Sequence, residues 1–273
     1  MSLLARAQLS LLILLAPAAA YASCGLQQLG LALQQAESRW AEFDDAQGRR
    51  LLSERGRLPG AALELRAACT EGWPALELRA QRGKGERAYQ GQSNQGQALA
   101  TTAELRDTRL QAQLWQRVAP ALELGLLSEW QQIHRELADA GAVRGYPERH
   151  RRYRLGLGLR LHGELSPAWQ YMLQGEWAVG PAGRLHLELP IADPVDLPSG
   201  RLQRQLGLQL QLQWSIPDAP AWQLGAGLGW RQEQLSEGEL ATLWRAGNAV
   251  GGVRQPSTRT QEWVPELALL YVF

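Results

Sequence analysis

The sequence predicts an all-β fold, a transmembrane antiparallel up-and-down β-barrel of ten strands, with twelve strands as the alternative. Three observations predict it. Long segments alternate apolar and polar residues with a period of two, which puts the two kinds of side chain on opposite faces of a strand. The connections between these segments are short and long in turn. Aromatic residues recur on the apolar faces at a constant spacing.

Several of the alternating segments carry about nine or more residues, the length that a tilted strand needs to cross a bilayer. Ordinary strands have about five or six residues. The clearest segment puts Tyr153 and a run of leucines on one face, with arginines and glycines on the other. The predicted strands span residues 25–43, 58–69, 73–82, 100–116, 121–135, 149–165, 168–179, 201–216, 221–235 and 258–273.

The short connections all contain proline, whereas the longer ones, at 44–57, 83–99, 136–148, 180–200 and 236–257, are polar. In outer-membrane barrels the short turns face the periplasm and the long loops face outside, so an even number of strands leaves both termini in the periplasm. The alternating piece 184–189 either extends a hairpin above the membrane or adds a strand and raises the count to twelve. Loop 236–257 carries several apolar residues and is a candidate for surface interaction or for a lid.

Aromatic pairs eight residues apart recur on three predicted strands, as in Trp169 and Trp177. Eight residues at about 3.3 Å each, tilted by about 40°, span roughly 20 Å along the barrel axis. This is close to the spacing of the two aromatic girdles of a membrane barrel. The predicted girdle residues are Trp130, Tyr153, Trp169, Trp177, Trp214, Trp222, Trp230, Trp263, Tyr271 and Phe273.

The last predicted strand runs from Trp263 to Phe273, and one of its faces is wholly apolar with an aromatic residue at each end. It resembles the terminal strand of Gram-negative outer-membrane barrels, which typically end in Phe after a Tyr or Leu two residues earlier. The resemblance implies a location in the bacterial outer membrane, beside its lipid and lipopolysaccharide. It also implies recognition of the C-terminal strand by the barrel assembly machinery. Pro265 removes a ladder donor, so we expect a bulge or an open hydrogen bond there.

Residues 1–22 read as a secretory signal peptide, with Arg6, an apolar run and a small-x-small end, leaving 23–273 as a single barrel domain. The chain has 28 basic and 27 acidic residues, and loss of Arg6 with the signal leaves 27 of each. A neutral total argues against a nucleic-acid partner. In an exported chain Cys24 and Cys69 predict a disulfide, and the rival interpretation is a lipidated Cys24.

The inward faces of the predicted strands carry many charges of both signs. Pairing across the first tight turn sets Arg66 opposite Glu77 and Glu64 opposite Arg79, which is favourable for both pairs. Ten strands enclose a lumen only a little wider than eight, and long side chains fill it. Inward glycines such as Gly156 and Gly158 leave some room. The predicted lumen network consists of Glu64, Arg66, Glu77, Arg79, Asp107, Arg109, Glu123, Arg154, Arg160, Glu176 and Arg231.

The alternation of the first strand is irregular. On this strand the outward candidates Ala36 and Trp40 have switched parity, so we expect a bulge near residues 34–35.

A cluster of arginines at the outer rim lies where lipopolysaccharide phosphates would be, and charge-assisted pairing or ordinary solvation both fit. It consists of Arg144, Arg149, Arg151 and Arg152.

Ten-stranded barrels of this size include the omptin surface proteases, which set a pair of acids and an Asp–His pair at the outer rim. Asp44 and Asp45 form an acid pair here, but no aspartate lies two residues from His134 or His150. Ser128 shares a parity with His134, yet six residues put them about 20 Å apart, too far for a nucleophile and its base. The sequence contains no Cys/His cluster, phosphate loop or Gly-x-Ser-x-Gly element, so it assigns no catalytic residue, metal or cofactor.

These observations favour a non-catalytic outer-membrane barrel with a charged, largely plugged lumen and a structural or surface-interaction role. The first alternative is a porin-like narrow passive pore for small solutes. The second is an outer-rim hydrolase, either a protease or a lipid A-modifying enzyme, which would need His134 or His150 to converge with an acid and a nucleophile or water.

Overall fold

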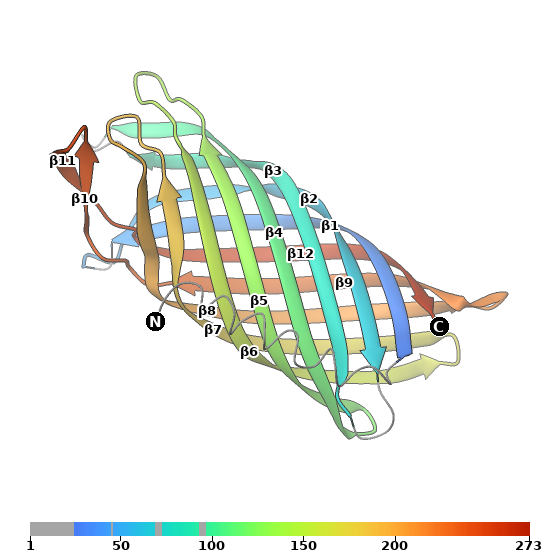
Figure 1. The fold of residues 1–273 in the computed structure, drawn as a ribbon. Coiled ribbons are helices and arrows are strands. Elements are labelled where there is room, and N and C mark those ends of the chain that lie inside the picture. The colour runs from blue at the N-terminus through green and yellow to red at the C-terminus, as the bar shows by residue number, and fades with distance from the viewer. Residues whose placement is uncertain (1–24, 45, 69–72, 93–96) are drawn as a thin grey trace.

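In the computed structural model the described residues are 25–44, 46–68, 73–92 and 97–273. They form ten long strands that close into one antiparallel barrel, with a small two-stranded sheet outside it (Figure 1). No helix among these residues is long and apolar enough to cross a membrane. The predicted ten-stranded barrel is confirmed. Its strands are β1 (Gly25–Asp44), β2 (Arg49–Ala68), β3 (Ala75–Gln92), β4 (Ala98–Ala119), β5 (Leu122–Leu137), β6 (Pro147–Ser166), β7 (Trp169–Leu187), β8 (Val195–Ile216), β9 (Ala219–Leu235) and β12 (Ser257–Val272).

The C-terminal strand closes the barrel. β12 pairs with β9 on one side and with β1 on the other, and the β1 register sets Leu31 opposite Leu269. The ladder to β1 is open at Pro265: Gln34 pairs with Glu266 and Glu37 with Trp263, without a register shift between them. Proline lacks the N–H that this ladder would use, so the open hydrogen bond replaces a bulge.

Alternation separates the two faces of the wall. Outward leucines are unusually exposed, for example Leu31 at 58% and Leu155 at 63%, while the inward positions are polar and buried. A continuous exposed belt of large apolar side chains is unfavourable in water and favourable against lipid chains. The outward face of β1 is apolar up to Leu33 and polar at Gln35, Glu37 and Arg39. The apolar outward face of β1 therefore ends near Leu33, and the strand continues beyond it toward the end of the barrel that carries the long connections.

Two predicted loops are strands. Residues 49–57 and 83–92 continue β2 and β3, and the register runs up to the pair Ser53 and Gln90. Their outward residues, such as Arg57 and Lys84, are charged, so the apolar alternation that marks a membrane strand stops while the backbone ladder continues. The prediction was wrong because the signal that it used reports lipid contact and not strand pairing.

The expected bulge near residues 34–35 is also wrong. The β1–β2 register is unbroken there, and its shifts lie instead at Leu26/Gln28 and Glu42/Phe43. Ala36 and Trp40 keep the inward parity of the residues before them. The apparent switch is the point at which the outer face becomes polar and the inner face gains apolar side chains.

The end of the barrel opposite the C-terminus, here called the outer end, carries the long connections and the short sheet of β10 (Ala241–Arg245) and β11 (Asn248–Val253) (Figure 1). Residues 184–187 extend β7 and pair with β8 as far as Leu187 and Val195, so the count stays at ten. Leu185, Leu187 and Leu197 form a small core with side chains from three connections. The outer end is thus a packed structure.

Candidate functional site

The lumen holds the densest set of charged side chains in the described part of the chain. All eleven predicted lumen positions lie on inward faces. They fall into two layers, one in the middle of the barrel and one near the short turns. A third layer of charges, toward the outer end, contains none of them. Seven of the ten strands supply these eleven residues, because every second residue of a strand points inward. The layers differ in which charges meet.

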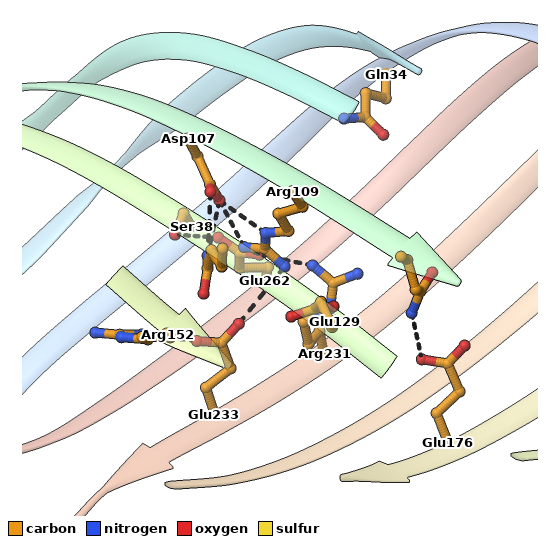
Figure 2. A network of polar contacts seen from close by, with 12 residues as sticks. Gln34, Ser38, Asp107, Arg109, Glu129, Arg152, Glu176, Arg231, Glu233 and Glu262 are labelled. Atoms are coloured by element: carbon orange, nitrogen blue, oxygen red, sulfur yellow. Dashed lines mark hydrogen bonds and ion pairs between the residues drawn. The ribbon is translucent and has the colours of Figure 1, made fainter. Parts of the chain in front are cut away.

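Arg109 on β4 is the centre of the middle layer. Its Nε donates to Asp107 Oδ2 at 2.8 Å, and its Nη2 donates to Glu262 Oε2 of β12 at 2.8 Å. Its Nη1 lies 3.5 Å from Glu233 Oε1 of β9. Figure 2 shows these carboxylates converging on the guanidinium from different strands. Arg109 therefore ties together β4, β9 and β12, which are not all neighbours in the sheet.

Glu233 is the second centre of this layer. It accepts hydrogen bonds from Arg152 at 3.0 Å and from Arg154 at 3.1 Å (Figure 2 labels Arg152 and Glu233). Arg154 also binds Glu129 and donates to Gln131 Oε1 at 2.7 Å. Buried charges are tolerated only when they are paired and hydrogen-bonded. The layer meets the pairing requirement, although Arg152 Nε and Arg154 Nε have no hydrogen-bond partner among the described residues. It matches four carboxylates with four guanidiniums: Asp107, Glu129, Glu233 and Glu262 with Arg109, Arg152, Arg154 and Arg231.

The layer near the short turns contains the remaining predicted charges. Arg79 pairs with Glu64 on the neighbouring strand and with Glu266. Arg160 donates to Glu77 at 2.9 Å and lies 3.5 Å from Glu123. A third arginine, Arg66, pairs with Glu123 at 3.0 Å and with Glu77 at 3.9 Å, and Glu176 accepts from the amides of Gln111 and Gln113.

Sequence reasoning missed the third layer, toward the outer end. Arg135 binds Glu54 and lies 2.7 Å from Glu148, whose carboxylate is 3.2 Å from His150 Nε2. Arg87 lies 3.7 Å from the second oxygen of Glu54. Three members of this layer, Glu54, Arg87 and Glu148, lie in the segments that were predicted to be loops. Their inward parity, continued from β2, β3 and β6, is the signal that would have found them.

A buried indole fills the room beside Gly158, one of the inward glycines that were expected to leave space. Trp115 of β4 is 2% exposed, and its Nε1 donates to Gln113 Oε1 at 2.9 Å. A Cβ at Gly125 or Gly158 would lie only 2.6 or 2.5 Å from its ring. The Arg160 guanidinium stacks over the same ring at 4.0 Å. Gly125 on β5 and Gly158 on β6 therefore leave the space that the Trp115 side chain of β4 occupies.

The spaces that remain in the lumen are small. Those lined by Arg79 and Gln174 measure about 60 Å³ each, and the one beside Arg109 measures about 20 Å³. Such volumes hold a few water molecules at most. A hydrated ion passing along this lumen would have to displace paired arginine and glutamate side chains.

Glu42, at the end of β1 above the bilayer, carries a pKa raised from 4.5 to about 8. Burial is the largest cause, Arg135 opposes it, and the negative charges of Glu148 and Glu54 add to it. The folded protein therefore holds a proton on Glu42 that the unfolded chain releases above pH 4.5. The free energy of unfolding falls as the pH rises from about 4.5 to about 8.

We expect Glu42→Gln to remove this fall. Across pH 5 to 8, the wild type should lose stability relative to the variant, because only the wild type has an unfolded state that releases this proton. Urea midpoints in detergent at several pH values measure the difference. Glu136→Gln, an exposed acid on β5, is the control and should track the wild type. A difference in urea midpoint between Glu42→Gln and wild type that does not change with pH would contradict the raised pKa of Glu42.

The candidate hydrolase residues do not converge. His134 and His150 lie on neighbouring strands, but His134 faces outward and His150 is buried in the lumen beside Glu148. Asp44 Oδ1 accepts the backbone N–H groups of Ala46 and Gln47 in the β1–β2 turn. Asp45 lies outside the described residues, and Ser128 is on the outward face of β5, six residues from His134. In the described ranges no group of three His, Cys, Asp or Glu is arranged to hold a metal ion.

The predicted rim cluster is corrected in one position. Arg149 and Arg151 face outward above the apolar belt, whereas Arg152 has the opposite parity and is buried against Glu233. Arg144 lies in the β5–β6 connection and is exposed. The two cysteines of the predicted disulfide, Cys24 and Cys69, lie outside the described residues, as does the predicted signal peptide.

The ten predicted girdle residues face outward in two rows. Trp263 pairs in register with Trp230, and Trp130 with Tyr153, toward the outer end. Tyr271 pairs with Trp222, and Trp169 with Trp214, toward the short turns. The ring of Tyr271 makes edge contacts with Trp222 and Phe273, at 5.0 and 4.8 Å between centroids. Trp177 is half exposed and belongs to the outer row, in register with Leu206.

No family model matches the sequence, and no curated protein matches it either. Among solved structures the chain is similar to the outer membrane protease OmpT from Escherichia coli, with a TM-score of 0.58 and 10% identity over 91% of this chain and 97% of that one. It is also similar to the translocator domain of the autotransporter NalP from Neisseria meningitidis, with a TM-score of 0.42 and 13% identity over 98% and 96% of the two chains. At these identities the likeness concerns the fold alone.

The closed barrel, its apolar outer wall and its charged interior define the class of the protein. It is a small ten-stranded β-barrel of the bacterial outer membrane. Within that class, OmpT shares the barrel architecture over 91% of this chain.

Proposed function

We propose that this protein is a non-catalytic outer-membrane barrel whose lumen is closed and whose role is structural or surface-interacting. The observation that carries the proposal is the balanced middle layer, in which Arg109 and Glu233 bridge strands across the lumen. A ring of charges that serves a channel leaves water beside it. Here the charged groups are paired with each other.

The outward face of the barrel wall supports the proposed placement in the membrane. The two aromatic rows are proposed to be the interfacial girdles, with lipid against the leucines between them. Export through the predicted signal peptide 1–22 and recognition of the C-terminal strand by the barrel assembly machinery complete the proposed route. The outward position of Arg149 and Arg151 at the outer rim supports charge-assisted contact with lipopolysaccharide phosphates as part of the proposal.

The β10–β11 sheet is the proposed surface for interaction outside the membrane. Trp244 of β10 is 51% exposed, and Leu240, just before β10, is 74% exposed. The sheet is held in place because Asp193 N donates to Trp244 O at 2.7 Å and Asp193 Oδ2 accepts from Ala246 N at 3.0 Å. An apolar surface that is fixed in position binds partners with less loss of entropy than a flexible loop does.

Single-channel recording in planar bilayers tests the proposal. The wild-type barrel should insert without producing discrete conductance steps, since the remaining spaces are about 60 Å³ or less. A variant in which Arg109 and Glu262 are both replaced by alanine is the control, because it removes the central bridge while keeping the net charge. Steady, uniform conductance steps from the wild type would contradict the closed lumen and favour the passive pore.

A further inference from the structure

The outer faces of β12, β1, β2 and β3 form a regular grid of side chains above the girdle. In the row at girdle level, the register sets Trp263 beside Glu37, Glu37 opposite Arg57, and Arg57 opposite Glu86. Charges of opposite sign alternate along this row. Arg57 Nη2 lies 3.3 Å from Glu37 Oε1. The charges of this row are therefore matched by other charges on the same surface.

The next row outward is unmatched. Arg39 and Arg55 are direct cross-strand partners, flanked by Gln261 on β12 and Ala88 on β3. Like charges directly opposite each other on one face of a sheet are destabilising. Among the residues that the structure describes, no carboxylate forms an ion pair with either arginine. The arrangement has a cost that no group within the described wall offsets.

These arginines border a groove in the outer wall. It has a volume of about 520 Å³, and small side chains, Ala41, Ser53 and Ala88, form part of its lining. The row beyond Arg39 sets Ala41 between Arg259 on β12 and Ser53 on β2. The one carboxylate at the groove, Glu54, is buried and bound to Arg135. The cations of the groove are Arg39, Arg50, Arg55 and Arg259.

We propose that this groove binds the phosphorylated sugar headgroup of an outer-leaflet glycolipid, that is, of lipopolysaccharide. Arginine forks match phosphate oxygens in pairs, and a phosphate between Arg39 and Arg55 converts their repulsion into two charge-assisted contacts. The groove is large enough for a sugar phosphate, and a free phosphate ion would fill only a small part of it.

The height of the groove selects the lipid as the source of the phosphate. Its rows lie two and four residues beyond Trp263, or about 5 to 10 Å above the girdle along a tilted strand. The headgroup zone on each side of a bilayer is about 5–7 Å thick. The inference rests on the outer-membrane placement of the barrel and is independent of whether the lumen conducts.

Binding of lipopolysaccharide to the refolded full-length barrel in detergent tests the site. The probe is purified rough-type lipopolysaccharide, and the variant is Arg39→Gln with Arg55→Gln. The matched control is Arg57→Gln with Lys84→Gln, which removes two outward cations that already have acid partners. We expect the dissociation constant to rise at least tenfold in the groove variant, which loses two charge-assisted contacts, and about twofold or less in the control.

Thermal unfolding without lipopolysaccharide supplies a second readout. The groove variant should unfold at the wild-type temperature or above it, because the repulsion between two arginines is removed. Lipopolysaccharide should raise the midpoint of the wild type more than that of the variant. Equal affinity of the groove variant and the wild type, or an equal loss in the control, would overturn the site. Binding of inorganic phosphate as tight as that of lipopolysaccharide would overturn the lipid as its source.

Discussion

Glu233→Leu is expected to lower the free energy of unfolding of the barrel by about 3–5 kcal/mol. Glu233 is 4% exposed, and three arginines depend on it: Arg152 at 3.0 Å, Arg154 at 3.1 Å and Arg109 at 3.5 Å. Removing the carboxylate leaves their charges buried and under-compensated, which costs more than the loss of the pair itself. Urea titration in detergent, followed by tryptophan fluorescence, measures the change.

Two variants separate charge imbalance from a general packing defect. Glu104→Leu removes an acid that also has two cationic neighbours, Lys84 and Arg106, but on the exposed outer wall, so it should remain close to wild type. Adding Arg152→Leu to Glu233→Leu lowers the number of unmatched arginines and should recover part of the loss. A double variant less stable than Glu233→Leu alone would argue against charge balance as the cause.

Trp115→Ala should cost about 3–5 kcal/mol, because it removes a buried indole and leaves a cavity. The ring packs on Gly125 and Gly158 and stacks with Arg160. The same unfolding measurement applies. Trp130→Ala is the matched control, because its side chain faces outward and lipid or detergent can occupy the space that it leaves.

A cycle with Gly158→Val identifies the contact. In the wild-type background this substitution should destabilise the barrel, since its Cβ would lie 2.5 Å from the indole. With Trp115→Ala the new side chain enters the vacated space and should be neutral or stabilising. Equal effects of Gly158→Val in both backgrounds would show that the indole does not occupy this position.

Much of the fold was predictable from particular residues. The alternation in β6 and β8 and the aromatic spacing in β7, β9 and β12 identified both faces, and the alternating short and long connections predicted ten strands. The positions of the strand ends were not predictable in this way. Arg57 and Lys84 lie on strands that rise above the bilayer, and there a polar outward residue looks like a loop residue.

The lumen network was predictable in part of its membership and in the pairs of a single hairpin. The opposed pairs across the first turn, Arg66 with Glu77 and Glu64 with Arg79, follow from one hairpin and are in register. The partners of Arg109 are different, because Glu262 and Glu233 come from strands far away in the sequence. Trp115 was overlooked because a tryptophan at an inward position has no alternation signal of its own.

By itself the sequence determined which side of each strand meets lipid and which side meets the lumen, because a period of two is a property of the backbone. Tertiary structure alone decided which charges meet across the lumen and which outer arginines remain without a partner. Those contacts depend on the stagger and cross-section of the closed barrel, and closure is a property of all ten strands together. The proposed phosphate groove belongs to the second kind, since it exists only where β12 returns to lie beside β1.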